Sequence, residues 1–165
     1  MLTNIKGRKL TNIILTGDVD TEDEIIDFLS DLTLLAFQFD DKYLIFEAIE
    51  QYSRISITES SELIFHEIPE EGLRKAHISL MNLLVINGEL SDLTVDRMIL
   101  YDIDPDRDSA VCEAVKIILS NGQNFFLDPC NFWGFTMGSE LMEKNWLDNM
   151  QALKRYDHKM TIIEL

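Results

Sequence analysis

Cys130 lies in the stretch FFLDPCNFWGFTMG, from Phe125 to Gly138, which combines a thiol and an aspartate with several aromatic side chains. A catalytic thiol needs an imidazole or a positive environment to lower its pKa. The three histidines are distant in the sequence: His66, His77 and His158. We therefore interpret Cys130 as a packed thiol, with a nucleophile as the alternative. Trp133 is a candidate contact residue, because tryptophan is favoured in binding hot spots.

The segment DIDPDRDSAVCE, from Asp102 to Glu113, offers a second possible chemistry. Its carboxylates follow the ligand order of an EF-hand calcium loop. However, Arg107 occupies the position where the sharp turn of that loop requires glycine, and Pro105 stiffens the backbone. This pattern predicts a solvated acidic loop that joins two strands, with a specific calcium site as the alternative.

A third segment, GDVDTEDEIID, is the most acidic in the chain. The positive end of a helix dipole would explain acidic residues in a first helical turn, but it leaves Asp18 and Asp20 unexplained. We predict that this segment and the Asp102 loop form one negative face for a basic partner, with a merely solvated surface as the alternative. The predicted partner-binding residues are Asp18, Asp20, Glu22, Asp23, Glu24, Asp27, Asp102, Asp104, Asp106, Asp108 and Trp133.

Other recognisable chemistry is missing from the sequence. The histidines and cysteines lack paired zinc-ligand spacing, and HEIPE at His66 lacks the second histidine of a zincin helix. Phosphate-binding glycine loops and the GxSxG serine motif are absent, and nothing selects one pair of carboxylates for acid–base work. We therefore predict no catalytic site, no metal and no cofactor.

Composition narrows the functional class of the protein and the kinds of partner it could bind. Thirty acidic and fourteen basic residues give a net charge of −16, a field that repels nucleic acid and anionic lipid but attracts cationic proteins. Acidity that serves solubility alone is the plain alternative. Two cysteines without CxxC spacing and no long apolar run favour a cytoplasmic protein without a membrane segment.

Alternating apolar residues predict strands over 9–15, 34–39, 43–49, 53–60 and 92–104, with a final edge strand near the C-terminus. Asn121-Gly122 predicts a hairpin closed by a two-residue type I′ turn. Helical spacing after Thr21, a candidate N-cap, predicts a helix over 21–32. Two more helices are expected after Pro69 and after Ser139.

These elements predict an α+β fold in a single globular domain over residues 1–165, with a mainly antiparallel sheet of about six to eight strands and two or three helices. A chain of this length can bury a core of its own without disulfides or metals.

The stretches IKGRKLTNIILTG and LLAFQFDDKYLIFEAIE resemble the opening of small bacterial toxin-immunity proteins, of the contact-dependent growth inhibition and polymorphic toxin type. FFLDPCNFWGF is similar to segments of the same proteins. The resemblance implies a cytoplasmic inhibitor, not an enzyme, that neutralises one cognate toxin domain, such as a basic nuclease. A monomer is favoured. The alternatives are a structural or regulatory subunit of a bacterial complex and a cysteine-dependent hydrolase.

Overall fold

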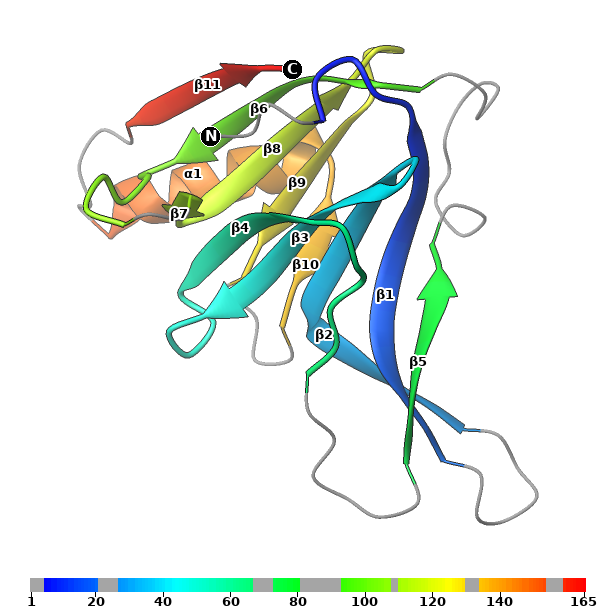
Figure 1. Cartoon of the computed structure of the whole chain (residues 1–165). Helices are drawn as coiled ribbons and strands as arrows, with labels where there is room; N and C mark the ends of the chain where they lie inside the picture. The colour runs from blue at the N-terminus through cyan, green and yellow to red at the C-terminus, as the bar shows by residue number, and fades with distance from the viewer. Residues whose placement is uncertain are drawn as a thin grey trace.

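The computed structural model describes residues 5–20, 27–66, 73–80, 93–107, 110–129, 134–153 and 159–165. These residues form eleven strands and one helix, arranged as two antiparallel sheets (Figure 1). Sheet 1 has six strands, in the spatial order β5 (Arg74–Ser79), β1 (Leu10–Asp20), β2 (Asp27–Phe39), β3 (Lys42–Ile49), β4 (Arg54–Ser60) and β7 (Ala110–Cys112). Sheet 2 has five, in the order β10 (Thr136–Gly138), β9 (Asn124–Asp128), β8 (Ala114–Leu119), β6 (Val95–Tyr101) and β11 (Met160–Glu164).

The main hydrophobic core lies between the two sheets. Phe37 of sheet 1 meets Phe125 of sheet 2 edge to face at 6.2 Å between ring centroids, and Phe46 beside it at 5.3 Å. Such edge-to-face pairs add to the stabilisation that burial of the rings provides. The chain changes sheets within a single extended stretch, because β7 belongs to sheet 1 and β8 to sheet 2, with Glu113 at the corner. The two sheets therefore share one core and cannot be separated without exposing it.

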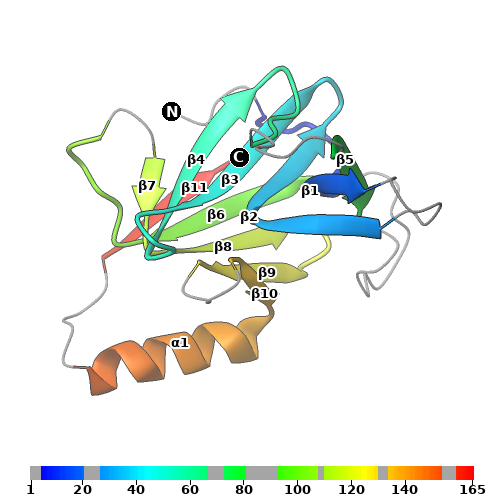
Figure 2. The ribbon, with the colours of Figure 1, turned by 90° about the horizontal axis from the view of Figure 1, so that it is seen from below.

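The helix α1 (Glu140–Ala152) lies along the outer side of sheet 2 (Figure 2). Its Trp146 is 5% exposed and packs against Tyr101 and Phe126 at 5.3 and 5.7 Å between ring centroids. The carboxylate of Glu143, on the same helix, accepts hydrogen bonds from Lys116 and from the Tyr101 hydroxyl. α1 is thus held against sheet 2 by the aromatic cluster and by the two hydrogen bonds that Glu143 accepts.

Strand prediction from local pattern succeeds over most of the chain. The predicted strands over 9–15, 34–39, 43–49, 53–60 and 92–104 correspond to β1, β2, β3, β4 and β6, and the C-terminal edge strand is β11. The mainly antiparallel character of the fold is confirmed, but the predicted numbers of strands and helices are not. The described residues contain eleven strands and one helix, where six to eight strands and two or three helices were expected.

The predicted helix over 21–32 is wrong from Asp27 onward, and its first six residues lie outside the described ones. Phe28, Leu29 and Ser30 pair instead with Val19, Asp18 and Gly17 of β1. Their apolar spacing fits a helix, but pairing with the preceding strand β1 decides the conformation, because propensity is a weak prior that tertiary context overrides.

The predicted helix after Pro69 is also wrong over the residues that the structure describes. Residues 69–72 and 81–92 lie outside the described part of the chain, and Arg74–Ser79 form β5. This strand pairs with the edge of β1, with His77 opposite Thr16. By contrast, the helix after Ser139 is confirmed, although Ser139 makes no side-chain capping bond.

The hairpin at Asn121-Gly122 is confirmed, but its turn type is not. Gly122 has a φ of 83°, whereas Asn121 is not among the residues with positive φ, as a type I′ turn would require. The Gly122 N–H donates to the carbonyl of Leu119 at 2.9 Å, and the Leu119 N–H donates to that of Gln123 at 2.8 Å. A three-residue loop with a left-handed glycine therefore closes β8 and β9.

Within the described residues, no helix combines the length and the apolar character needed to cross a lipid bilayer.

Candidate partner-binding surface

The first acidic segment of the sequence forms the end of a β-arm. We call Gly17–Asp20 of β1 and Asp27–Ser30 of β2 the acidic arm. β2 begins to pair with β3 only at Leu34, so β3 does not cover this part of β2. The arm runs past the ends of β3 and β4 (Figure 1).

Like charges face each other at the end of this arm. The register places Asp20 directly opposite Asp27, and Asp27 is exposed. The sequence from Asp18 to Asp27 holds six carboxylates and no lysine or arginine. Like charges opposite each other on paired strands repel, so the register concentrates negative charge at this end of the arm.

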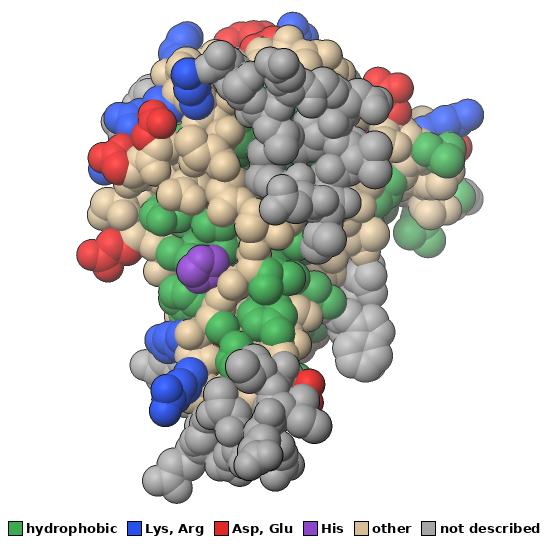
Figure 3. All heavy atoms as spheres, turned by 90° about the vertical axis from the view of Figure 1, so that its right-hand side faces the viewer, with side chains coloured by type: hydrophobic (Ala, Val, Ile, Leu, Met, Phe, Trp, Pro, Cys, Tyr) green, Lys and Arg blue, Asp and Glu red, His purple; other side chains and the backbone are tan. Residues whose placement is uncertain are grey.

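Within the part of the chain that the structure describes, basic side chains of β5 flank the β1 edge of the arm. Lys75 of β5 lies opposite Asp18 in the register, and Arg74 lies opposite Val19. The side of the molecule that carries β5 shows Lys and Arg side chains beside a group of hydrophobic ones around a histidine (Figure 3). The negative charge of the arm is therefore least compensated along β2, where Leu29 is also 53% exposed.

An irregular stretch of β2 fixes the base of the arm. Leu15 of β1 pairs with Leu35, but Gly17, two residues later, pairs with Ser30. Residues 31–34 of β2 therefore bulge opposite the single residue Thr16. A bulge of this kind bends its strand and redirects side chains.

A polar cluster holds this bulge in place. Asp31 accepts hydrogen bonds from the backbone N–H and the hydroxyl of Thr33, at 2.9 and 2.5 Å. His66 lies between two carboxylates, with its Nδ1 2.6 Å from Asp31 and its Nε2 3.2 Å from Glu47. An imidazole with carboxylates at both nitrogens ties β2, β3 and the segment after β4 together.

Backbone contacts fix the same bulge from the other sheet. The Phe135 N–H donates to the carbonyl of Leu32 at 2.6 Å. Gly134, with a φ of 109°, approaches so closely that a Cβ would lie 2.2 Å from the Leu32 oxygen. Glycine is required here both by its positive φ and by the close backbone approach. The arm therefore extends from the two packed sheets at a bulge that contacts from both sheets hold in place.

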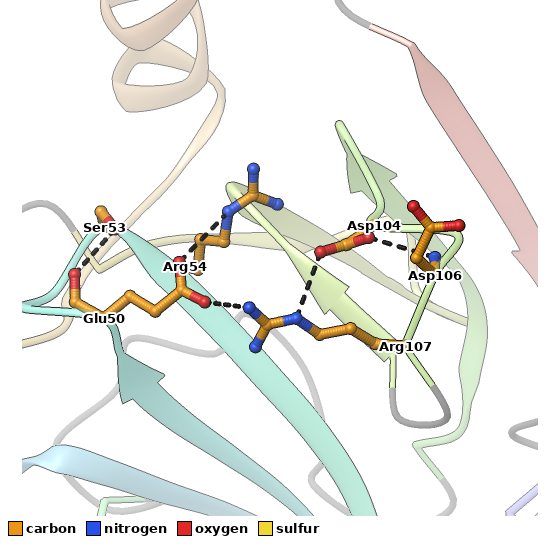
Figure 4. A network of polar contacts seen from close by, with 6 residues as sticks. All are labelled: Glu50, Ser53, Arg54, Asp104, Asp106 and Arg107. Atoms are coloured by element: carbon orange, nitrogen blue, oxygen red, sulfur yellow. Dashed lines mark hydrogen bonds and ion pairs between the residues drawn. The ribbon is translucent and has the colours of Figure 1, made fainter.

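The Asp102 loop, the second predicted acidic segment, is held by contacts within the molecule. Arg107 binds Glu50 of the β3–β4 turn and reaches Asp104 at 3.1 Å, and Arg54 lies 3.6 Å from Glu50 (Figure 4). The bond to Glu50 raises the pKa of the Arg107 guanidinium. This network joins the two sheets, so Arg107 has a structural role at the position where an EF-hand needs glycine.

The carboxylates of this loop are also engaged. Asp104 accepts a hydrogen bond from the Asp106 N–H at 3.1 Å, and Asp102 accepts one from the Lys159 N–H at 3.0 Å, beside β11. The described residues contain no group of three or more His, Cys, Asp or Glu side chains that could hold a metal ion.

The structure separates the two acidic segments. The arm and the loop between β6 and β7 lie at opposite ends of the molecule in both ribbon views (Figures 1 and 2). The expectation that they form one negative face is therefore not met. Several predicted contact residues, and the packed or nucleophilic Cys130, lie outside the described residues: Glu22, Asp23, Glu24, Asp108, Cys130 and Trp133.

Sequence reasoning missed the Asp31–His66–Glu47 cluster. These residues are far apart in the chain, and the HEIPE segment at His66 resembles only an incomplete zinc motif. No spacing rule connects the three, since the bulge in β2 is what brings Asp31 to His66. The remaining thiol, Cys112, is fully buried in β7, and burial raises its pKa to about 12.

Comparisons with known proteins give no relative. No protein-family model, no curated protein and no solved structure matches this chain.

Proposed function

We propose that this chain is an immunity-type inhibitor that acts in the cytosol and binds a basic toxin domain, such as a nuclease, through its acidic arm. The observation that carries the proposal is the register of Asp20 opposite Asp27 at the end of the arm. A cationic partner would be attracted to these two opposed carboxylates, because they bring two negative charges to one place on the surface.

The setting of the arm supports a protein partner. Leu29 adds an exposed apolar side chain opposite Asp18, and protein interfaces combine apolar contacts with charged surroundings. The bulge and the His66 cluster brace the base of the arm, and a surface organised before binding loses less entropy on association. The net charge of −16 would speed the encounter with a cationic domain.

We favour the arm over the Asp102 loop as the contact surface. Arg107 supplies a positive charge within that loop, whereas the sequence from Asp18 to Asp27 holds no lysine or arginine. A cationic partner is therefore attracted less strongly to the loop.

Affinity capture tests the proposal with two variants of equal charge. D20N/D27N removes two negative charges from the arm, whereas D96N/D148N removes two exposed charges from β6 and α1. From a lysate of the organism that encodes the chain, the wild type and D96N/D148N should retain one basic protein, and D20N/D27N should retain it at least tenfold less.

The retained protein must then lose its toxic activity in the presence of the wild-type chain at equal molar amounts. Capture of the same protein by D20N/D27N at the wild-type level, or a retained protein whose activity the chain does not inhibit, would contradict the proposal.

A further inference from the structure

The outer edge of β11 is unpaired within the part of the chain that the structure describes, because β11 ends sheet 2 and pairs there with β6 alone. The Asp102 N–H donates to the Lys159 carbonyl and the Leu165 N–H donates to that of Asp96, both at 2.9 Å. Since bonded and non-bonded pairs alternate along an antiparallel ladder, the odd-numbered residues of β11 bond to β6. The even-numbered residues therefore direct their backbone N–H and C=O groups to the free edge: Met160, Ile162 and Glu164.

Two apolar side chains lie beside this edge, on the side of sheet 2 that carries α1. Met160 is 62% exposed and Ile162 is 55% exposed. Ile162 lies opposite Ile99, which packs against the aromatic cluster of Trp146, and residues opposite each other point to the same face of a sheet. Ile163, on the other face, packs against the main core. The apolar surface beneath α1 thus continues to the outermost strand.

Among the described strands, the other sheet edges are less suited to pairing with a further strand. β7 and β10 contain three residues each. β5 carries the exposed basic residues Arg74, Lys75 and His77, and charged side chains on an edge strand oppose further pairing. By contrast, β11 has no charged residue from Met160 to Ile163 and no proline. Natural sheets protect their edges, so an unprotected edge indicates a partner strand.

We infer that β11 pairs antiparallel with β11 of a second copy of this chain, around a two-fold axis. In the register centred on Thr161, Met160 of each copy lies opposite Ile162 of the other, and both residues direct their backbone groups to the partner. Antiparallel pairing also brings the basic end of each strand, at Lys159, to the acidic end of the other, at Glu164. Parallel pairing would bring like charges together. The charges of β11 are therefore complementary to those of a second β11.

This pairing gives a closed dimer. It joins two five-stranded sheets into one sheet of ten strands, with both α1 helices on the same side. The acidic arm belongs to sheet 1 and lies at the far end of the molecule from β11, so it stays accessible (Figure 1). The inference therefore goes beyond the proposed function, and it departs from the monomer expected from the sequence.

Sedimentation equilibrium of the full chain tests the inference. One strand pair is a small interface, so we expect a dissociation constant of about 10–1000 µM. Because each copy carries a net charge of −16, dimerisation should strengthen as salt rises, whereas binding of a cationic partner should weaken. This opposite salt dependence separates the dimer from the proposed function. A chain that stays monomeric up to about 1 mM at high salt, or that forms species larger than a dimer, would overturn the inference.

Two variants with the same change of charge locate the contact. I162K places a lysine at the free edge and should weaken the dimer at least about tenfold. L141K replaces another exposed apolar side chain, at the start of α1 beside β10 and the opposite edge of sheet 2, and should leave the dimer within about twofold of the wild type. Equal dimerisation by I162K and L141K would refute the contact through β11.

Amide hydrogen exchange of the wild type locates the contact without any variant. As the protein concentration rises, exchange of the Met160 and Ile162 amides should slow, because these N–H groups find acceptors in the dimer. The Thr161 and Ile163 amides already donate to β6 and should change less. Slowing that spares Met160 and Ile162 would place the contact elsewhere and contradict the inference, even if I162K does not fold.

Discussion

Cys112 gives the protein a pH-dependent stability that follows from burial. Its folded-state pKa is raised to about 12, while an unfolded thiol ionises near about 8.5. Above that pH the unfolded chain binds fewer protons than the folded one, so the free energy of unfolding falls as pH rises. Burial also raises the pKa of Tyr101, which acts in the same direction at higher pH.

We therefore expect the free energy of unfolding of the wild type to fall by about 1–2 kcal/mol more than that of C112A between pH 8 and pH 10. Urea denaturation at both pH values measures the difference. Equal losses in the two proteins would show that the Cys112 thiol ionises as readily in the folded state as in the unfolded one.

Glu143 holds a largely buried ion pair beneath α1. Its Oε2 lies 2.6 Å from Nζ of Lys116, and the two side chains are 13% and 14% exposed. E143A leaves the lysine without its counter-charge and the Tyr101 hydroxyl without its acceptor. We expect a loss of about 2–3 kcal/mol in the free energy of unfolding, below the range for fully buried pairs.

The exposed Asp148 provides the control on the same helix, and D148A should stay within about 0.5 kcal/mol of the wild type. E143Q keeps an acceptor for Tyr101 and should fall between the two. A cost for E143A no larger than that of D148A would mean that the pair adds nothing to stability.

The bulge of β2 depends on Gly134 in the facing segment. A Cβ at this position would lie 2.2 Å from the Leu32 oxygen, which also accepts the Phe135 N–H. Gly7 has a positive φ as well, but a Cβ there would meet nothing within 4 Å. We expect G7A to cost about 1 kcal/mol and G134A to cost about 3 kcal/mol or more, because only the second forces the backbone apart.

Urea denaturation of both variants tests this, with the ¹H–¹⁵N spectrum of G134A as a second readout. Shifts should centre on Leu32, Thr33 and His66. Similar costs for the two substitutions would indicate that the segment from Gly134 does not brace the arm.

The elements differ in how far local sequence determines them. The β2–β3 and β8–β9 hairpins follow from alternating apolar residues and short turn segments, and both are present. Asp27–Leu32 and Arg74–Ser79 were expected to be helical, because their apolar spacing is compatible with a helix. The start of β2 pairs with the preceding strand β1, and β5 pairs with the other edge of β1. Apolar spacing alone encodes neither pairing.

The candidate site was foreseen only in part. The sequence predicts the acidic character of Asp18–Asp27. It does not predict that Asp18, Asp20 and Asp27 lie at the end of an arm. Two of the ion pairs, Arg107 with Glu50 and His66 with Asp31, join residues more than thirty positions apart in the sequence. Such contacts depend on the finished sheet order, which the sequence pattern left open.

At the scale of the whole molecule, we expect the opposed charges of the arm to lower the free energy of unfolding while they favour binding of a cationic partner. D20N/D27N removes the opposed charges, and we expect the free energy of unfolding to rise by about 0.2–1 kcal/mol. D96N/D148N lowers the net charge equally but relieves no opposed pair, so its gain should be smaller. Urea denaturation at low salt compares them, and a larger gain for D96N/D148N would argue against a cost at the arm.

The association rate with the captured partner is the most direct test of the acidic arm. We expect the rate for the wild type and D96N/D148N to fall steeply between low and high salt, and the rate for D20N/D27N at low salt to be at least tenfold lower than that of D96N/D148N. Equal association rates for the two variants at low salt would contradict the claim that the arm is the surface that a cationic partner meets.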